Sequence, residues 1–153
     1  MTAFPVGYRL MVKACDPTHD EADGPQLDRS AFYFLNVYAY DIAAANGSRI
    51  AWVASIHPYR VDAADAVSEV VKRGALALKW LLAVMRIDPA SPLCNRFYDA
   101  VAKHDLPLDT HGGEEKAVEG AAAGARQRIE IAAFIRARCA GSSGGLRTSG
   151  AEY

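Results

Sequence analysis

The sequence lacks the features that would assign it to a membrane, a secretory pathway or a disulfide framework. No apolar run approaches the roughly 20 residues that a membrane-spanning helix needs. Residues 1–5 contain no basic region followed by an apolar one, so we expect no secretory signal. The three cysteines, Cys15, Cys94 and Cys139, are widely spaced and form no Cys-x-x-Cys pair. This pattern favours a reducing cytoplasm over disulfides or a structural zinc site.

The chain also lacks a strong charge of either sign. Lys and Arg number 17 and Asp and Glu 18, for a net charge of −1, which gives no electrostatic basis for binding nucleic acid or an anionic membrane. Neither a Gly-x-Gly-x-x-Gly pattern nor a phosphate-binding loop is present. With 153 residues, the chain has the length of one globular domain. We therefore expect a cytoplasmic protein with no nucleic-acid or membrane partner.

Apolar β-rich segments alternate with amphipathic ones along the chain. Residues 8–14 fit either a strand or the end of a helix, and the acidic stretch 16–28 is typical of a loop. Ser30 and Asp62 are suitable N-caps, and Gly74 is a suitable end for the second helix. The predicted strands are 49–56, 75–80 and 107–110, and the predicted helices are 31–46, 62–73, 93–104 and 117–140.

This order indicates an α/β fold with parallel strands. The strands end near Ile56, Trp80 and Thr110, at intervals of 24 and 30 residues, close to the roughly 31 residues of one unit of a (β/α)8 barrel. We therefore expect a partial (β/α)8 TIM barrel of about three βα units over residues 1–140. Residues 141–153 are rich in Gly and Ser and are expected to be a disordered tail.

Three polar side chains stand at or near these strand ends. His111 is the strongest candidate, either as a zinc ligand or as a residue that caps the strand. Lys79 lies in an apolar strand, where it either has an active amine or extends to water. His57 either lines the pocket or packs against its neighbours. We expect all three to converge at one end of a parallel sheet.

Further residues flank these positions. Trp80, Glu114 and Glu115 are candidates for substrate binding, although the two glutamates also suit the first turn of a helix. His19 and His104 are interpreted as incidental. Cys94 has no neighbouring base in the sequence and is not expected to be a nucleophile.

Several strings resemble the middle of the amidohydrolase superfamily, and most closely its amidohydrolase-related, metal-dependent hydrolases of TIM-barrel fold. The similarity covers about residues 1–120, and the strand that ends at His111 and the turn at residues 87–92 are its most specific parts. The strings are Leu78–Leu81, Met85–Pro92, Phe97–Ala100 and Leu106–Glu115.

The resemblance implies a barrel that binds one or two divalent metals, commonly zinc, and uses a metal-bound water to attack a small-molecule substrate of carbonyl type. By this resemblance His111 corresponds to the metal ligand after the fifth barrel strand. Lys79 corresponds to the end of the fourth strand, where some relatives carry a carbamylated lysine, and this makes it the candidate catalytic residue. His57 corresponds to the third strand.

The chain departs from that family in its ligands. Members of the family open with a His-x-His or Asp-x-His pair on the first barrel strand, and this chain has no such pair before the strand that ends at His111. After His111 it contains no histidine and no aspartate. We therefore expect a slice of a barrel, truncated or frame-shifted after Gly120, that is inactive as an isolated chain, which leaves its status as an enzyme open. The alternative is a non-catalytic α/β fragment that forms a homo-oligomer through exposed strand edges. A small flavodoxin-like binding domain is disfavoured without a phosphate loop.

Overall fold

The structure covers most of the chain up to residue 111. A computed structural model describes residues 10–20, 23–30 and 32–111. The predicted helix 117–140 and tail 141–153 lie outside the described residues, so the predicted domain boundary between them stays a prediction. Within the described ranges, no helix is both long and apolar enough to cross a membrane.

Four parallel strands form the framework of the fold. A parallel bridge between Ala54 and Leu78 joins two strand pairs, so that the order is β1-β4-β5-β6. The predicted α/β arrangement with parallel strands is confirmed, and the described residues do not close into a barrel. The strands are β1 (Leu10–Lys13), β4 (Ile50–Val53), β5 (Leu78–Leu81) and β6 (Leu108–His111).

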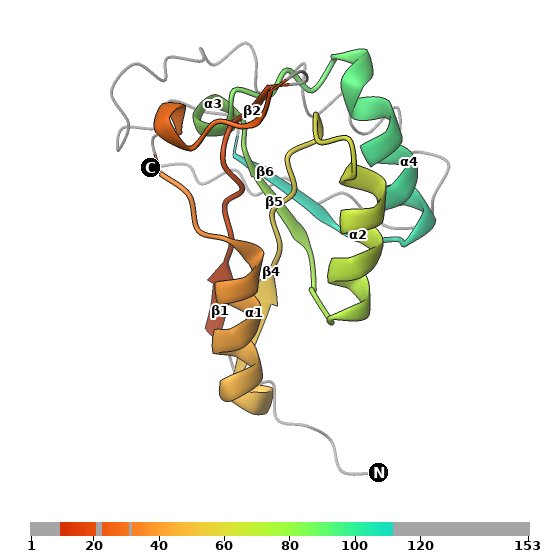
Figure 1. The fold of residues 1–153 in the computed structure, drawn as a ribbon. Helices are drawn as coiled ribbons and strands as arrows, with labels where there is room; N and C mark the ends of the chain where they lie inside the picture. The colour runs from red at the N-terminus through yellow and green to blue at the C-terminus, as the bar shows by residue number, and fades with distance from the viewer. Residues whose placement is uncertain (1–9, 21–22, 31, 112–153) are drawn as a thin grey trace, which may run out of the picture.

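Helices connect successive strands, as parallel pairing requires. Figure 1 shows α1 beside β1 and β4, and α2 beside α4. A short hairpin lies in the connection between β1 and α1. The helices are α1 (Asn36–Ala45), α2 (Ala63–Lys72), α3 (Leu82–Met85) and α4 (Asn95–Lys103), and the hairpin strands are β2 (His19–Asp20) and β3 (Gly24–Pro25).

The pleat of β5 and β6 separates a helix-facing side from an opposite side. Trp80 is fully buried on the helix-facing side, where it stacks on Phe97 of α4 with ring centroids 4.6 Å apart. Leu78 and Leu108, which are register partners, are buried in the same core. Since successive side chains of a strand point to opposite faces, Lys79 lies on the other side of the sheet.

The first connection differs from its prediction. The predicted helix 31–46 begins only at Asn36, because Phe34 forms an antiparallel bridge with Cys15 that keeps the preceding backbone extended. Ser30 does not cap this helix. Its hydroxyl group instead accepts a hydrogen bond from the Thr18 N–H and donates one to the Gln26 carbonyl.

Other element boundaries also move. Residues 10–13 form a strand, which decides between the two readings of 8–14 and gives four parallel strands where about three units were expected. The strand predicted at 75–80 lies at 78–81, and the chain continues directly into α3. The helix predicted at 93–104 is shorter, at 95–103, because a 3-10 turn at 92–94 precedes it.

Candidate functional site

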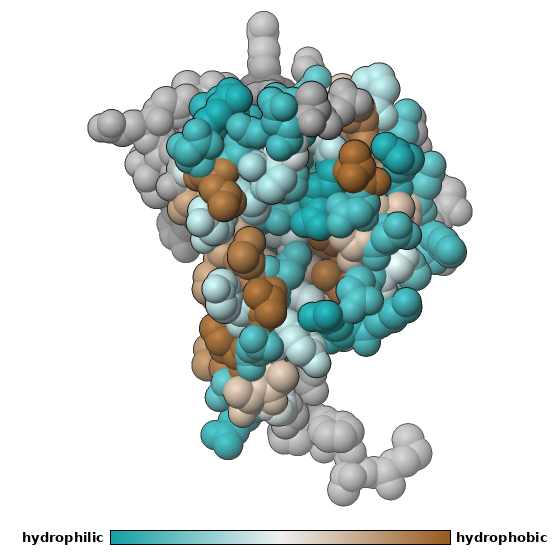
Figure 2. Space-filling model, in the orientation of Figure 1, coloured by the Kyte–Doolittle hydropathy of each residue, from teal (hydrophilic) through white to brown (hydrophobic). Residues whose placement is uncertain are grey.

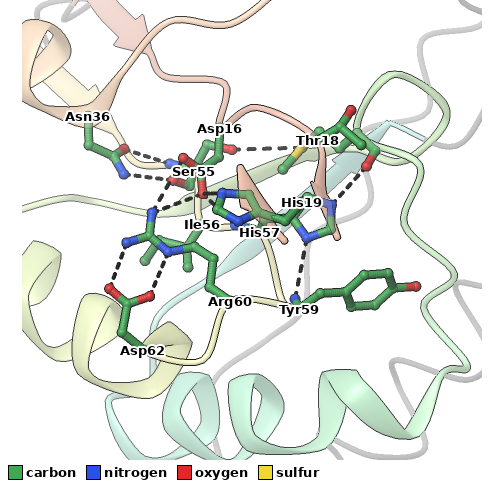
Figure 3. Close-up of polar contacts among 12 residues, drawn as sticks. Asp16, Thr18, His19, Asn36, Ser55, Ile56, His57, Tyr59, Arg60 and Asp62 are labelled. Carbon is green, nitrogen blue, oxygen red and sulfur yellow. Dashed lines mark hydrogen bonds and ion pairs between the residues drawn. The ribbon is translucent and has the colours of Figure 1, made fainter. Parts of the chain in front are cut away.

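Asp16 ties together the loops that follow β1 and β4. Its carboxylate is buried and accepts hydrogen bonds from the main-chain N–H of His57 at 2.8 Å and from Nη1 of Arg60 at 3.2 Å (Figure 3). A buried carboxylate needs such partners, because its transfer out of water is costly without them. The two carboxyl ends of neighbouring strands are therefore fixed to each other by one side chain.

Arg60 extends this network to the start of α2. Its Nε and Nη2 atoms donate to the two carboxylate oxygens of Asp62, each at 2.8 Å, in a bidentate pair. The hydrogen bond from Arg60 lowers the pKa of the Asp62 carboxyl below its usual value, and the same pairing raises the pKa of the guanidinium. Asp62 stands at the predicted N-cap position, but its side chain caps no main-chain N–H and binds Arg60 instead.

His57 is fully enclosed and uses both ring nitrogens. Its Nε2 lies 2.8 Å from the carbonyl oxygen of Met85, and its Nδ1 accepts a hydrogen bond from the N–H of Tyr59 at 3.3 Å. Because a carbonyl oxygen only accepts, Nε2 carries the proton. Burial lowers the pKa of the imidazole to about 4, so the ring is neutral near pH 7. The predicted contact of His57 with substrate stays a prediction.

His19 belongs to this cluster, although the sequence interpretation treated it as incidental. Its ring centroid lies 5.2 Å from that of His57, and its Nε2 lies 3.8 Å from Oδ2 of Asp16. Burial is the main cause that lowers its pKa, against the opposing charge of Asp16. The β2–β3 hairpin holds it there, with Gly24 at a φ of 74° that favours glycine. The Gly24-Pro25 pair is the local sequence signal for a turn after His19, but it does not indicate where that turn places the His19 side chain.

Lys79 lies on the opposite side of the sheet from the helices and is paired. Its Nζ donates to Oδ2 of Asp109 at 2.9 Å, and the two residues are register partners on β5 and β6. Lys13 of β1 approaches the same oxygen at 3.8 Å. The catalytic role predicted for Lys79 stays a prediction, and the structure adds Asp109 and Lys13 as its neighbours.

The other predicted site residues are distributed between two faces. His111 is exposed at the last position of β6, on the same side of the strand as Asp109. Trp80 lies on the helix-facing side, and its indole N–H donates to the Ile56 carbonyl at 2.8 Å. Trp80 and Lys79 therefore lie on opposite faces of the sheet, and the predicted role of Trp80 in substrate binding stays a prediction. Glu114 and Glu115 lie outside the described residues.

The parallel strand directions bring His57, Lys79 and His111 toward one end of the sheet, but their contacts differ. His57 is engaged by Met85 and Tyr59, and Lys79 is engaged by Asp109. In the part of the chain that the structure describes, no group of three or more His, Cys, Asp or Glu residues could hold a metal ion. The described residues alone therefore do not supply the three protein ligands that a catalytic zinc site normally needs, and the metal-binding role predicted for His111 stays a prediction.

Comparisons with known proteins give one distant structural likeness. No family model matches the chain, and no curated protein matches it. A crystal structure of an amidohydrolase II superposes with a TM-score of 0.46 at 17% sequence identity, over 68% of this chain and 36% of that one. The chain thus spans about a third of the length of this structure.

Proposed function

We propose that this chain is a segment of an amidohydrolase-like hydrolase acting on a small carbonyl-type substrate, and that the isolated chain does not turn over substrate. The observation that supports this proposal is the position of His111, exposed at the carboxyl end of β6 on the face that also carries Lys79. In open α/β sheets and barrels, sites form at the carboxyl ends of parallel strands. The sequence resemblance supports the reaction class.

The second part of the proposal follows from the number of ligands. His111 supplies one imidazole, and His57 has both nitrogens engaged in hydrogen bonds within the fold. A catalytic zinc site usually needs three protein ligands, and the described residues gather no such set.

The test combines zinc titration by calorimetry with hydrolysis of 4-nitrophenyl acetate. We expect weak zinc binding that His111→Ala reduces and His104→Ala leaves unchanged, with no zinc-dependent hydrolysis above a protein-free control. His104 is a suitable control because it lies at the end of α4, away from the carboxyl edge of the sheet. Tight one-to-one binding with hydrolysis that His111→Ala abolishes would overturn the proposed inactivity. Binding that is insensitive to His111→Ala would remove His111 from the site.

A second candidate function is self-association through the β1 side of the sheet. β1 lies at one end of the strand order in the described residues, and its Leu10 and Met11 side chains are 71% and 55% exposed. Figure 2 shows further apolar side chains over the region of β1 and α1, where Val37 and Ile42 are exposed. Exposed edges with apolar side chains favour pairing with another chain.

Light scattering coupled to size-exclusion chromatography tests this candidate. We expect a concentration-dependent dimer that Met11→Lys weakens, because a charge on an edge strand opposes pairing. Val61→Lys is the matched control, since Val61 is also an exposed apolar residue, at 79%, but lies before α2, away from β1. A chain that stays monomeric at all concentrations would contradict self-association.

A further inference from the structure

Two lysines from different strands share one carboxylate on the side of the sheet that faces away from the helices. Oδ2 of Asp109 lies 2.9 Å from Nζ of Lys79 and 3.8 Å from Nζ of Lys13. Register pairing places Lys79 beside Asp109, whereas Lys13 belongs to β1 at the other end of the strand order. The contact therefore spans all four parallel strands.

Together with the expected width of the sheet, this contact indicates that the strands curve around this face. Strands lie about 4.8 Å apart, so β1 and β6 in a flat sheet would be separated by roughly 14 Å. Side chains stand roughly perpendicular to a flat sheet, which would keep Lys13 and Asp109 apart. Their 3.8 Å contact thus requires the strands to curve around this face.

Within the described residues, two ammonium groups, those of Lys13 and Lys79, meet the single carboxylate of Asp109, so these three side chains together carry a net positive charge. Lys79 is only 12% exposed and is hydrogen-bonded to Asp109, whereas Lys13 is 45% exposed and its Nζ lies beyond hydrogen-bond distance from that carboxylate. An ammonium group has three N–H donors, so Lys13 can donate to a further oxygen acceptor. An anion placed beside both lysines would balance the excess charge in a partly enclosed position.

We propose that this concave face binds the carboxylate of a small organic acid through Lys13, with Lys79 as the second cation. The proposal deepens the proposed function, on which it rests, by naming the substrate class as a small carboxylic acid. His111 stands two residues beyond Asp109 on the same face, so a bound acid would extend toward the exposed end of β6. Asp109 then competes with the ligand for both lysines.

The experiment is a titration of the full chain with glutarate, followed by amide chemical shifts in a metal-free buffer of low ionic strength. We expect saturable shifts in β1 and β5, an affinity at least about tenfold lower in Lys13→Gln, and no change in Lys72→Gln. Lys72 is a matched control because it is an exposed lysine in the last turn of α2. No saturable shift, or equal effects of the two variants, would overturn the proposal.

Asp109→Asn separates a ligand site from a purely structural ion cluster. Removing the competing carboxylate is expected to raise glutarate affinity severalfold, whereas an unchanged or lower affinity in a variant that remains folded would contradict the proposal. If Asp109→Asn does not fold, the Lys13→Gln result still decides the matter, because Lys13 is half-exposed. Inorganic phosphate is the second probe, and tighter binding of phosphate than of glutarate would overturn the carboxylate assignment.

Failure of this proposal is distinguishable from failure of the proposed hydrolase function. His111→Ala is expected to reduce zinc binding and to leave glutarate binding within about twofold. Loss of glutarate binding in His111→Ala would contradict a carboxylate site centred on Lys13. Absence of hydrolysis has no bearing on the titration, because the titration contains neither metal nor a hydrolysable substrate.

Discussion

The side chain of Asn36 pairs with both main-chain groups of Ser55. Its Nδ2 donates to the Ser55 carbonyl at 2.7 Å, and its Oδ1 accepts the Ser55 N–H at 2.9 Å (Figure 3). β1 pairs with β4 as far as the bond from the Ala14 N–H to the Val53 carbonyl, and the chain then turns away to Phe34. The carboxamide of Asn36 therefore replaces a neighbouring strand just where the main-chain ladder ends.

Asn36→Asp is expected to lower the free energy of unfolding by about 1–3 kcal/mol, because a carboxylate cannot donate to the Ser55 carbonyl, which loses its partner. Urea denaturation measures this change. Asn46→Asp is the control, since Asn46 makes one exposed side-chain bond to the Ile42 carbonyl and its loss should cost less than about 1 kcal/mol. Equal losses in the two variants would show that the pairing with Ser55 adds no particular stability.

Removing the charge of Asp16 is expected to destabilise the fold more than removing that of Asp62. Asp16→Asn leaves the main chain of His57 and the guanidinium of Arg60 beside a neutral group in a buried position, at a cost of about 2–4 kcal/mol. Asp62 is half-exposed, so Asp62→Asn should cost less than about 1 kcal/mol. Thermal and urea unfolding of both variants test the order, and the reverse order would contradict the central role of Asp16.

Stability is expected to fall as the pH drops from about 6.5 toward 4. Burial lowers the pKa of His57 to about 4, against about 6.5 in the unfolded chain, so the folded chain binds fewer protons in this window. The contribution of His57 is complete above pH 6.5 and decreases by up to about 1.4 kcal/mol per pH unit below it. The shift of His19 acts in the same direction.

His57→Gln isolates this effect because glutamine does not titrate. Urea denaturation between pH 4.5 and 7.5 should show a flatter dependence of the free energy of unfolding on pH in His57→Gln than in the wild type. Identical slopes in wild type and His57→Gln would mean that His57 is not buried as a neutral ring.

Trp80→Ala is expected to lower the free energy of unfolding by about 3–5 kcal/mol. The substitution leaves a cavity against Phe97 and removes the donor to the Ile56 carbonyl. Leu76→Ala, at a half-exposed position two residues before β5, should cost less than about 1 kcal/mol. Urea denaturation compares the two. A loss below about 1 kcal/mol for Trp80→Ala would show that Trp80 is not a core residue and would favour the predicted contact with substrate.

Much of the secondary structure could be predicted from local patterns. β4 and β5 follow from apolar, β-rich segments, and α2 follows from an amphipathic stripe between Asp62 and Gly74, where Gly74 has a φ of 77°. The beginning of α1 could not be predicted, because the bridge between Cys15 and Phe34 joins residues that are distant in sequence and overrides the capping signal of Ser30.

The sequence by itself determined the parallel α/β pattern and the presence of His57, Lys79 and His111 at or near strand ends. Only the tertiary structure decided what these side chains meet. The strand register makes Lys79 the neighbour of Asp109, and the pleat directs Trp80 to the opposite face. The gathering of Asp16 and His19 beside His57 depends on two loops from different strands, and no local periodicity encodes such a contact.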